Sequence, residues 1–270
     1  MTRRYRSYKH EKRTRFGEED ILNTAKRNVI WLDELSTCEA KEAADIGTVV
    51  IFPVGSVEEH GRHLPLCTDS LQAEYIAVEV AKKTRCLVAP PLRHGICNAG
   101  HNFPGTISIG FDTVFAVARD VLSELTRNGF CRIIVLSGHA GSSHITALKL
   151  AAQEVVKRKQ DAGKRKTRIM VLSDYDFAYE LKDKLGFDKN DGHAGAMETS
   201  RVMAIRPDLI KAKGEASFPS MPRFEIVADP ERYFPSGVNG DPTQATHTKG
   251  KETNEYVIEQ LTKLVDELKG

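Results

Sequence analysis

Short apolar segments alternate with amphipathic segments along most of this chain, and this alternation limits the folds that it can adopt. The apolar segments cover residues 48–54, 86–91, 131–136 and 168–172. Helical patterns follow them, with apolar side chains at helical spacing, over residues 70–84, 111–128, 143–160 and 254–268. A further helix, introduced by the motif D-G-H-A-G-A-M-E-T-S, is expected to reach about residue 205. Strand and helix in alternation are typical of a mainly parallel sheet with helices on both faces. The sequence therefore predicts an α/β fold.

The chain has room for one large domain or two small ones, since it contains 270 residues. No linker rich in proline, glycine or serine divides its middle, so we expect a single domain over residues 21–270. Residues 1–20 form a basic extension before it. Such a tail can bind nucleic acid, but it more often faces solvent or contacts another subunit, so nucleic acid is not an expected partner. Residues 213–241 are turn-rich and are expected to be irregular.

No part of the sequence predicts contact with a membrane or a disulfide framework. No apolar run approaches the roughly 18 residues that a spanning helix needs, and the basic tail lacks the apolar core of a secretory signal. The five cysteines have irregular spacings without a C-x-x-C pair, which argues against structural disulfides and against a cysteine zinc site. We therefore expect a soluble protein of the cytoplasm.

Acidic and imidazole side chains gather directly after the first apolar segment, between Val54 and Asp69. Glu58 and His60 stand two residues apart, so both side chains point to one face of an extended segment. Carboxylate and imidazole are ligands that zinc and manganese prefer. A polar loop that faces water is the alternative, but several potential ligands at the end of one buried strand favour a metal site.

Two further motifs carry histidine. His139 lies in S-G-H-A-G after the apolar segment 131–136, where glycines on both sides let the backbone approach a metal or a substrate closely. His193 and Glu198 are too far apart for one helical face, so we place His193 in a loop and Glu198 in the first turn of the next helix. In open parallel sheets, ligands bind beyond the carboxyl ends of the strands. The motifs are therefore expected to converge on one crevice.

This set of residue types is typical of a two-metal hydrolase. One carboxylate bridges the ions, and a bridging water loses a proton near neutral pH. A separate histidine can then protonate the leaving group. The same ligands also suit a redox iron, so ligand type alone does not identify the metal.

Four separate motifs resemble the creatininase (creatinine amidohydrolase) family, and they occur in the family's order. They are G-S-V-E-E-H-G-R-H-L-P-L-C-T-D, S-G-H-A-G, D-G-H-A-G-A-M-E-T-S and G-V-N-G-D-P-T-Q-A-T. Together they extend over roughly residues 48–248, so the resemblance covers most of the chain apart from the basic extension. It implies a three-layer α/β/α sandwich with a mainly parallel central sheet.

The resemblance also implies a dinuclear metal site. Glu58 and His60 would bind different ions, Asp69 would bridge them, and His139 would complete the first. His193 would act as the catalytic acid and base. The expected cofactors are two divalent ions, zinc in the first place, with manganese or iron as alternatives. Family members are commonly hexamers, so the resemblance implies a homo-oligomer.

The chain departs from the creatinine-hydrolysing pattern at two positions. A glutamate that binds the second metal is replaced by Gly141, and we assign Glu198 as the replacement ligand, with a catalytic role as the alternative. A tryptophan four residues before the catalytic histidine is replaced by Lys189. A lysine there suits a hydroxylated or anionic substrate better than the flat ring of creatinine. The candidate substrate-binding residues are Arg62, His63, His101, Asn102 and Lys189.

The resulting functional hypothesis is a metal-dependent hydrolase, of amidohydrolase type, that acts on a carbonyl carbon of a small polar compound. It would cleave a non-peptide C–N bond of a cyclic amide or a formamide with a metal-activated water. The alternatives are hydrolytic ring opening of a cyclic diketone such as a diketo-inositol, which breaks a C–C bond, and deformylation of a pyrimidine intermediate in flavin or deazaflavin synthesis. A non-catalytic metal-binding scaffold is a further alternative, although a scaffold has no need of a proton donor such as His193.

Overall fold

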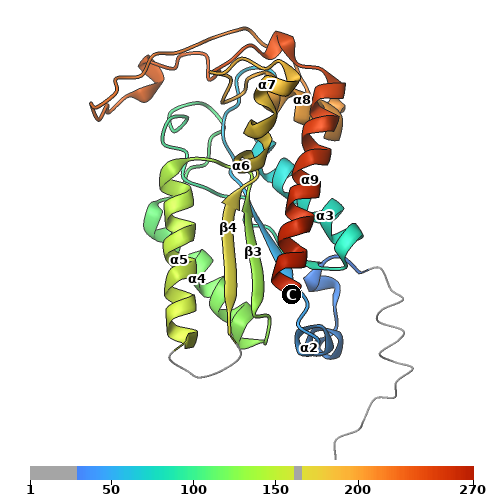
Figure 1. Ribbon diagram of the computed structural model, residues 1–270. Helices are drawn as coiled ribbons and strands as arrows, with labels where there is room; N and C mark the ends of the chain where they lie inside the picture. The colour runs from blue at the N-terminus through green and yellow to red at the C-terminus, as the bar shows by residue number, and fades with distance from the viewer. Residues whose placement is uncertain (1–28, 161–165) are drawn as a thin grey trace, which may run out of the picture.

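The computed structural model describes residues 29–160 and 166–270, and these residues form an α/β fold with one central sheet (Figure 1). The predicted basic extension, residues 1–20, lies outside the described residues. Four parallel strands make up the sheet in the order β2-β1-β3-β4. Their bounds are β1 Val50–Val54, β2 Leu87–Val88, β3 Arg132–Ser137 and β4 Arg168–Ser173. The α/β prediction is confirmed, and so are the positions of the four strands.

The register of the strands determines where the loops that follow them leave the sheet. The last residue of β1, Val54, pairs with Ser137 at the end of β3, and Ser137 in turn pairs with Ser173 at the end of β4. These three strands therefore end at the same level. The loops that follow them emerge side by side at one edge of the sheet, as expected for parallel strands.

Helices cover both faces of the sheet and make the three-layer sandwich that the resemblance implies. Helices α4 (Phe111–Arg127) and α5 (Ser142–Gln160) lie against one face, and α3 (Thr68–Thr84) and α9 (His247–Lys269) lie against the other (Figure 1). The strand residues alternate between the two cores, since Ile134 and Leu136 pack with the second pair of helices while Ile133 and Val135 pack with the first. The expected two-sided burial is confirmed.

The remaining helices are shorter. Helix α8 (Ala196–Ile205) crosses α9. The other short helices are α2 Thr37–Asp45, which precedes the sheet, and α6 Tyr175–Ala178 and α7 Lys182–Leu185, which follow β4. The 3₁₀ turns are η1 Leu32–Glu34, η2 Tyr179–Leu181, η3 Pro207–Leu209, η4 Pro230–Arg232 and η5 Pro242–Gln244. None of the described helices is both long and apolar enough to span a lipid bilayer.

Two helical regions differ from the prediction for physical reasons. Helix α2 was not predicted, although Ser36 and Glu39 form a capping box at its start, which is a readable signal. Helix α9 begins at His247 rather than near residue 254, because the Thr246 side chain caps it by accepting from the Lys249 amide. Gly250 lies inside this helix, where a side chain would collide with the backbone of Ser200 in α8. The glycine that obscured the helical pattern is thus needed for the helix crossing.

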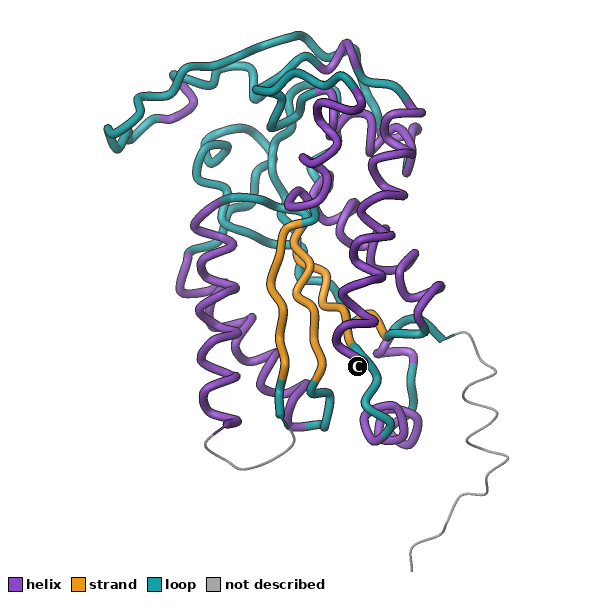
Figure 2. The backbone as a smooth tube through the Cα atoms, viewed as in Figure 1, coloured by secondary structure: helices purple, strands orange, loops and turns teal. Residues whose placement is uncertain are grey.

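Long loops gather beyond the carboxyl ends of the strands (Figure 2). The segment after η3 is irregular apart from short turns, as predicted for residues 213–241. Part of this segment projects from the body (Figure 1), and Phe224 and Ile226 are exposed, while Met221 and Phe234 line a cavity above the sheet. The sequence-distant loops therefore enclose one space at the carboxyl edge.

Candidate metal centre

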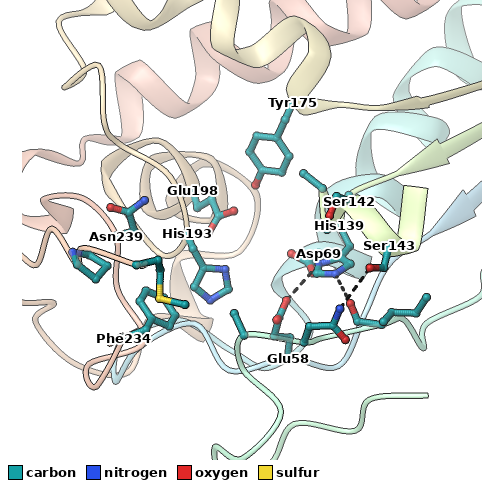
Figure 3. Close-up of a pocket in the computed structure, with 18 of the residues that line it drawn as sticks. Glu58, Asp69, His139, Ser142, Ser143, Tyr175, His193, Glu198, Phe234 and Asn239 are labelled. Atoms are coloured by element: carbon teal, nitrogen blue, oxygen red, sulfur yellow. Dashed lines mark hydrogen bonds and ion pairs between the residues drawn. The ribbon is translucent and has the colours of Figure 1, made fainter. Parts of the chain in front are cut away.

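Five ionisable side chains from four parts of the chain meet at the carboxyl edge of the sheet. Glu58, Asp69, His139 and Glu198 are labelled in Figure 3. All five are buried, with at most 8% of any residue exposed. They come from the loop after β1, the first turn of α3, the loop after β3 and the first turn of α8, and they are Glu58, His60, Asp69, His139 and Glu198. The structure thus brings together every metal ligand that was predicted from the sequence.

Asp69 lies at the centre of this cluster, with its two carboxylate oxygens facing in different directions. Oδ1 is 3.1 Å from Nε2 of His60, and Oδ2 is 2.9 Å from Nδ1 of His139. A side chain at Gly138 would place its Cβ 2.1 Å from the Asp69 carbonyl oxygen, so this glycine lets α3 begin directly against the end of β3. The close approach puts Asp69 between the two histidines.

One half of the cluster, which we call the first half-site, consists of Glu58, His139 and Oδ2 of Asp69. Glu58 Oε2 lies 3.1 Å from Nδ1 of His139. The other ring nitrogen of His139, Nε2, donates to the carbonyl oxygen of Ile96 at 2.9 Å. Because a carbonyl only accepts, this contact places a proton on Nε2, so Nδ1 is the ring nitrogen that faces the carboxylates of the half-site.

The second half-site consists of His60, Glu198 and Oδ1 of Asp69. Here Nδ1 of His60 donates to the Glu58 carbonyl at 3.1 Å, so the opposite nitrogen, Nε2, faces the carboxylates. Glu198 Oε2 is 3.6 Å from that nitrogen and accepts a hydrogen bond from the amide of Ala194. Ala194 has a φ of 51°, a left-handed conformation that is unusual for a residue with a side chain. This strained residue lies between His193 and α8 and holds Glu198 in place.

The cluster carries an excess of negative charge. Among the described residues, no lysine or arginine forms an ion pair with Glu58, Asp69 or Glu198; their ion-pair partners are histidines. Burial acts to lower the pKa of His60, but the carboxylates of Asp69 and Glu198 outweigh it and raise the pKa to about 10. Burial acts to raise the pKa of Asp69, and the attraction of His60 overcomes this and holds the pKa well below its usual range.

Divalent cations fit this arrangement. Glu58 Oε2 and His60 Nε2 are buried atoms without a well-aligned hydrogen bond in the described part of the chain. Buried polar atoms of this kind need a partner, and buried carboxylates need compensating charge. Three potential ligand atoms, one each from His60, Asp69 and Glu198, lie within 4.8 Å of one another. One carboxylate oxygen of Glu58 and one ring nitrogen of His139 also lie within this distance of each other. The carboxylate and imidazole donors are those that zinc and manganese bind.

His193 lies beside the cluster in the loop before α8, where it was predicted. Its ring packs on that of His60 with centroids 4.2 Å apart. Nε2 donates to the carbonyl oxygen of Glu59 at 2.8 Å and lies 3.2 Å from the carboxylate of the same residue. Burial and His60 act to lower the pKa of His193, but the contact with Glu59 and the nearby carboxylates raise it overall. The side chain is 25% exposed, which gives it access to a proton donor or acceptor outside the cluster.

A cavity of about 430 Å³ opens onto both half-sites. In the described part of the chain, no lysine or arginine lines it. Its polar lining is otherwise neutral or belongs to the cluster, and an aromatic ring and a thioether close one side. The lining residues outside the cluster and His193 include Asn98, Ser142, Ser143, Tyr175, Tyr179, Met221, Phe234 and Asn239.

The five predicted substrate-binding residues do not line this cavity. Gly61, with a φ of 63°, turns the chain so that Arg62 and His63 line a separate pocket of about 270 Å³ on the other side of Glu59. The amide of Asn102 donates to Glu231 at 2.9 Å. The other two predicted contacts, His101 and Lys189, are exposed on loops.

The expectation that these side chains contact a substrate above the cluster is therefore not supported by their positions. Lys189 faces solvent because the turn that carries it is built around its neighbours. Asp188 accepts from the Asn190 amide, and Asp191 caps α8 by accepting from the amides of Ala196 and Met197.

Sequence reasoning did not single out several residues that the structure places in the cavity. Tyr175 follows the end of β4, so the rule that located the other loops at strand ends could have found it. Asn239 lies in the fourth family motif, which was quoted without a role for that residue. Cys97 reaches the cluster from a loop that no local pattern connects with it.

Comparisons with known proteins show which family the chain resembles. The sequence profile of the creatininase family, described as creatinine amidohydrolase, matches residues 33–265. The chain is 29% identical over 260 residues to creatinine amidohydrolase of Pseudomonas putida, covering 88% of this chain and 96% of the relative. It is 30% identical over 242 residues to the mycofactocin precursor peptide peptidase of Mycobacterium ulcerans, covering 83% and 87%. It is 24% identical over 276 residues to 3-dehydro-scyllo-inosose hydrolase of Thermotoga maritima, covering 88% and 83%.

Solved structures show the same fold. A variant creatininase described as the Zn-Zn type superimposes with a TM-score of 0.79 at 25% identity, over 88% of this chain and 98% of that chain. A structure described as creatininase Mn gives a TM-score of 0.81 at 24% identity, over 88% and 98%. The chain belongs to the creatininase family, whose members are metal-dependent hydrolases.

Proposed function

We propose that this protein hydrolyses a non-peptide C–N bond at a carbonyl carbon of a small, neutral, polar compound such as a cyclic amide or a formamide. The observation that carries the proposal is the position of Asp69, which presents one oxygen to each half-site beneath a cavity that His193 lines. Two divalent ions in the half-sites would polarise the carbonyl group and lower the pKa of a water molecule.

The first ion would be held by Glu58, His139 and Asp69, and the second by His60, Glu198 and Asp69. Gly141 supports the assignment of Glu198, because a Cβ at position 141 would lie 2.5 Å from Nε2 of His139. A side chain there would disturb a ring that is fixed by Ile96, so the second half-site takes its acid from α8 instead. Zinc and manganese both suit these donors, and the related structures described above carry the names of both metals.

His193 is proposed as the residue that moves the proton. Its Nε2 is fixed by the Glu59 carbonyl, which leaves Nδ1 to exchange a proton with the substrate's leaving nitrogen. The net upward shift of its pKa favours a protonated ring that can donate. We assign Glu198 as a metal ligand because its carboxylate faces His60 and accepts a hydrogen bond from the backbone amide of Ala194.

The lining of the cavity indicates what the substrate is like. Neutral amides and hydroxyls, including those of Asn98, Ser143 and Asn239, can exchange hydrogen bonds with hydroxyl or amide groups. No described lysine or arginine of the lining is available to pair with a phosphate or carboxylate, so we expect a neutral substrate rather than the anionic one that Lys189 suggested. The volume of about 430 Å³ is typical of small-molecule sites.

Hydrolytic ring opening of a cyclic diketone is a second candidate, because the same neutral lining suits a polyhydroxylated ring. The similarity of this chain to a protein named 3-dehydro-scyllo-inosose hydrolase supports a cyclic ketone as the second class of substrate. Deformylation of a pyrimidine intermediate belongs to the first class of reaction and differs only in the leaving group.

A substrate panel tests the proposal. Protein loaded with zinc or manganese would be incubated with cyclic amides, formamides and keto-inositols, with the chelated protein and the His193→Gln variant as controls. Turnover of an amide or formamide that depends on both the ions and His193 is expected. Turnover of keto-inositols alone would favour the second candidate, and no turnover of any class by fully loaded protein would contradict both.

Two properties inferred from the sequence remain predictions. We expect a homo-oligomer, hexameric by the family resemblance, and a location in the cytoplasm. Sedimentation of the purified protein checks the first, and fractionation of cells that express it checks the second.

A further inference from the structure

Cys97 is a buried thiol beside the first half-site that has no part in the reaction described above. The residue is 1% exposed and lies in the loop between β2 and α4. Its Sγ, one carboxylate oxygen of Glu58 and one ring nitrogen of His139 all lie within 4.8 Å of one another. A single ion can therefore reach all three atoms after a small movement of the side chains, since metal–sulfur and metal–nitrogen bonds are about 2.3 and 2.1 Å long.

The backbone around Cys97 is fixed by the metal site itself. The preceding residue, Ile96, accepts the hydrogen bond that orients His139, and the Cys97 amide donates to the Ser108 hydroxyl at 2.9 Å. The loop thus positions a histidine ligand and the thiol together. A second feature points to a ligand at the same place, because Glu58 Oε2 is buried and lacks a well-aligned hydrogen-bond partner in the described chain.

The surroundings of the thiol favour its neutral form unless a cation binds. Burial, and then the carboxylate of Glu58, raise the pKa of Cys97 well above its usual value. A bound divalent ion reverses this effect, because a coordinating thiol loses its proton. On binding, the S–H bond would break, a bond from sulfur to the metal would form, and the proton would pass to solvent.

We propose that Cys97 is a ligand of the ion in the first half-site, together with Glu58, Asp69 and His139, and that it makes this half-site select zinc over manganese. The inference rests on the proposed metal centre and goes beyond it. Thiolate is a soft ligand that favours zinc, whereas manganese prefers oxygen donors. The second half-site offers only oxygen and nitrogen atoms, so the two ions would differ in how strongly they exclude manganese.

Cobalt substitution tests the ligand directly. Ion-free wild-type protein and the variants Cys97→Ser, Cys97→Ala and Cys86→Ala would be loaded with Co²⁺, and their bound cobalt and absorption spectra measured. Cys86 is the matched control, since it is equally buried but lies in the core between α3 and the sheet. A near-ultraviolet thiolate-to-cobalt band is expected in the wild type and in Cys86→Ala, and its loss is expected in both Cys97 variants.

The outcomes separate this inference from the proposed function. Cobalt bound without a thiolate band in the wild type would overturn the role of Cys97 and leave the dinuclear centre standing. Absence of bound cobalt from the wild type would overturn both. Because the wild-type spectrum alone decides the first point, the result does not depend on the variants being well folded.

Metal competition tests the selectivity. Ion-free wild type and Cys97→Ser would be equilibrated with zinc and manganese together, and the bound ions measured after removal of free metal. We expect the zinc-to-manganese affinity ratio at the first half-site to fall by about tenfold or more in the variant, in the range that changes around metal ligands produce. A ratio equal to that of Cys86→Ala would contradict the proposal.

Discussion

Helix α8 carries two buried charged groups one turn apart, and they are compensated in different ways. Arg201 pairs with Asp174 at 2.5 Å, and both residues are completely buried. The guanidinium also donates to Asn254 of α9 at 2.8 Å. Glu198, by contrast, faces the carboxylate of Asp69 and shares His60 with it. One region is neutral within the protein, while the other has more acid than base.

This contrast indicates that the first region is structural and that the second has the charge needed to hold cations. The pair of Arg201 and Asp174 joins α8 to the end of β4, and Asn254 extends the connection to α9. This network holds the helix whose first turn presents Glu198. The two charges of this buried pair cancel within the protein, whereas buried carboxylates without a basic partner are costly unless a cation is present.

The largest effect is expected from Asp69→Asn. Mutation of a residue that only contacts a metal ligand typically lowers metal affinity or activity by about 10–100-fold. Mutation of a ligand that two ions share should therefore lower activity by more than about 100-fold. We expect kcat/KM to fall by at least that factor, with fewer ions bound per chain. The exposed Asp120→Asn is the matched control. Normal activity and ion content in Asp69→Asn would contradict the shared role.

His193→Gln should separate proton transfer from ion binding. A positioned acid or base contributes about 10²–10⁴-fold, so kcat should fall by a factor in this range. The ion content should stay at the wild-type level, because Nε2 of His193 is already engaged with Glu59. His247→Gln, at an exposed position, provides the control. A variant that loses its ions along with its activity would make His193 a ligand instead.

The two regions of α8 should respond oppositely to removal of one acid. In chelated protein, Asp174→Asn should lower the free energy of unfolding by about 3–5 kcal/mol, because it leaves Arg201 as an unpaired buried charge. Glu198→Gln should raise it or leave it unchanged, since it removes one of several like charges. Urea unfolding in the presence of chelator measures both. Equal losses in the two variants would show that the acidic cluster is as self-sufficient as the ion pair.

The smallest effect is expected in the pH dependence of stability. In ion-free protein burial lowers the pKa of His60, but Asp69 and Glu198 raise it from 6.5 to about 10. Such a group stabilises the folded state fully below pH 6.5, and this contribution is lost as the pH rises toward 10. The unfolding midpoint of chelated protein should therefore fall between pH 7 and 10 more steeply than that of loaded protein. Parallel curves would contradict this account.

Much of the fold and the cluster could be predicted from the sequence because both follow from local patterns. Apolar runs marked the strands, and parallel strands bring their following loops to one edge. Glu58 and His60 were expected on one face of an extended segment, and in the structure both lie in the cluster, where His60 contacts Asp69 and Glu58 contacts His139. Glu198 could be placed because a helix start near residue 194 is readable.

The positions of several residues could not be predicted, because they depend on contacts that leave no local pattern in the sequence. The left-handed turn at Gly61 directs Arg62 and His63 to a different pocket, although both were candidate substrate-binding residues. Cys97 meets the cluster because the long loop that carries it folds back against the segment after β1, where the Ile107 amide donates to the Val57 carbonyl. Such contacts link segments some fifty residues apart, and only the assembled fold reveals them.

Electron paramagnetic resonance of the manganese-loaded protein can determine whether two ions share Asp69. Ion-free protein would be titrated with Mn²⁺ while the bound ions are counted. We predict two ions per chain and a spectrum of exchange-coupled manganese in the wild type, with the coupling lost in Asp69→Asn. Saturation at a single ion per chain, or two ions with the spectra of isolated manganese, would contradict the account.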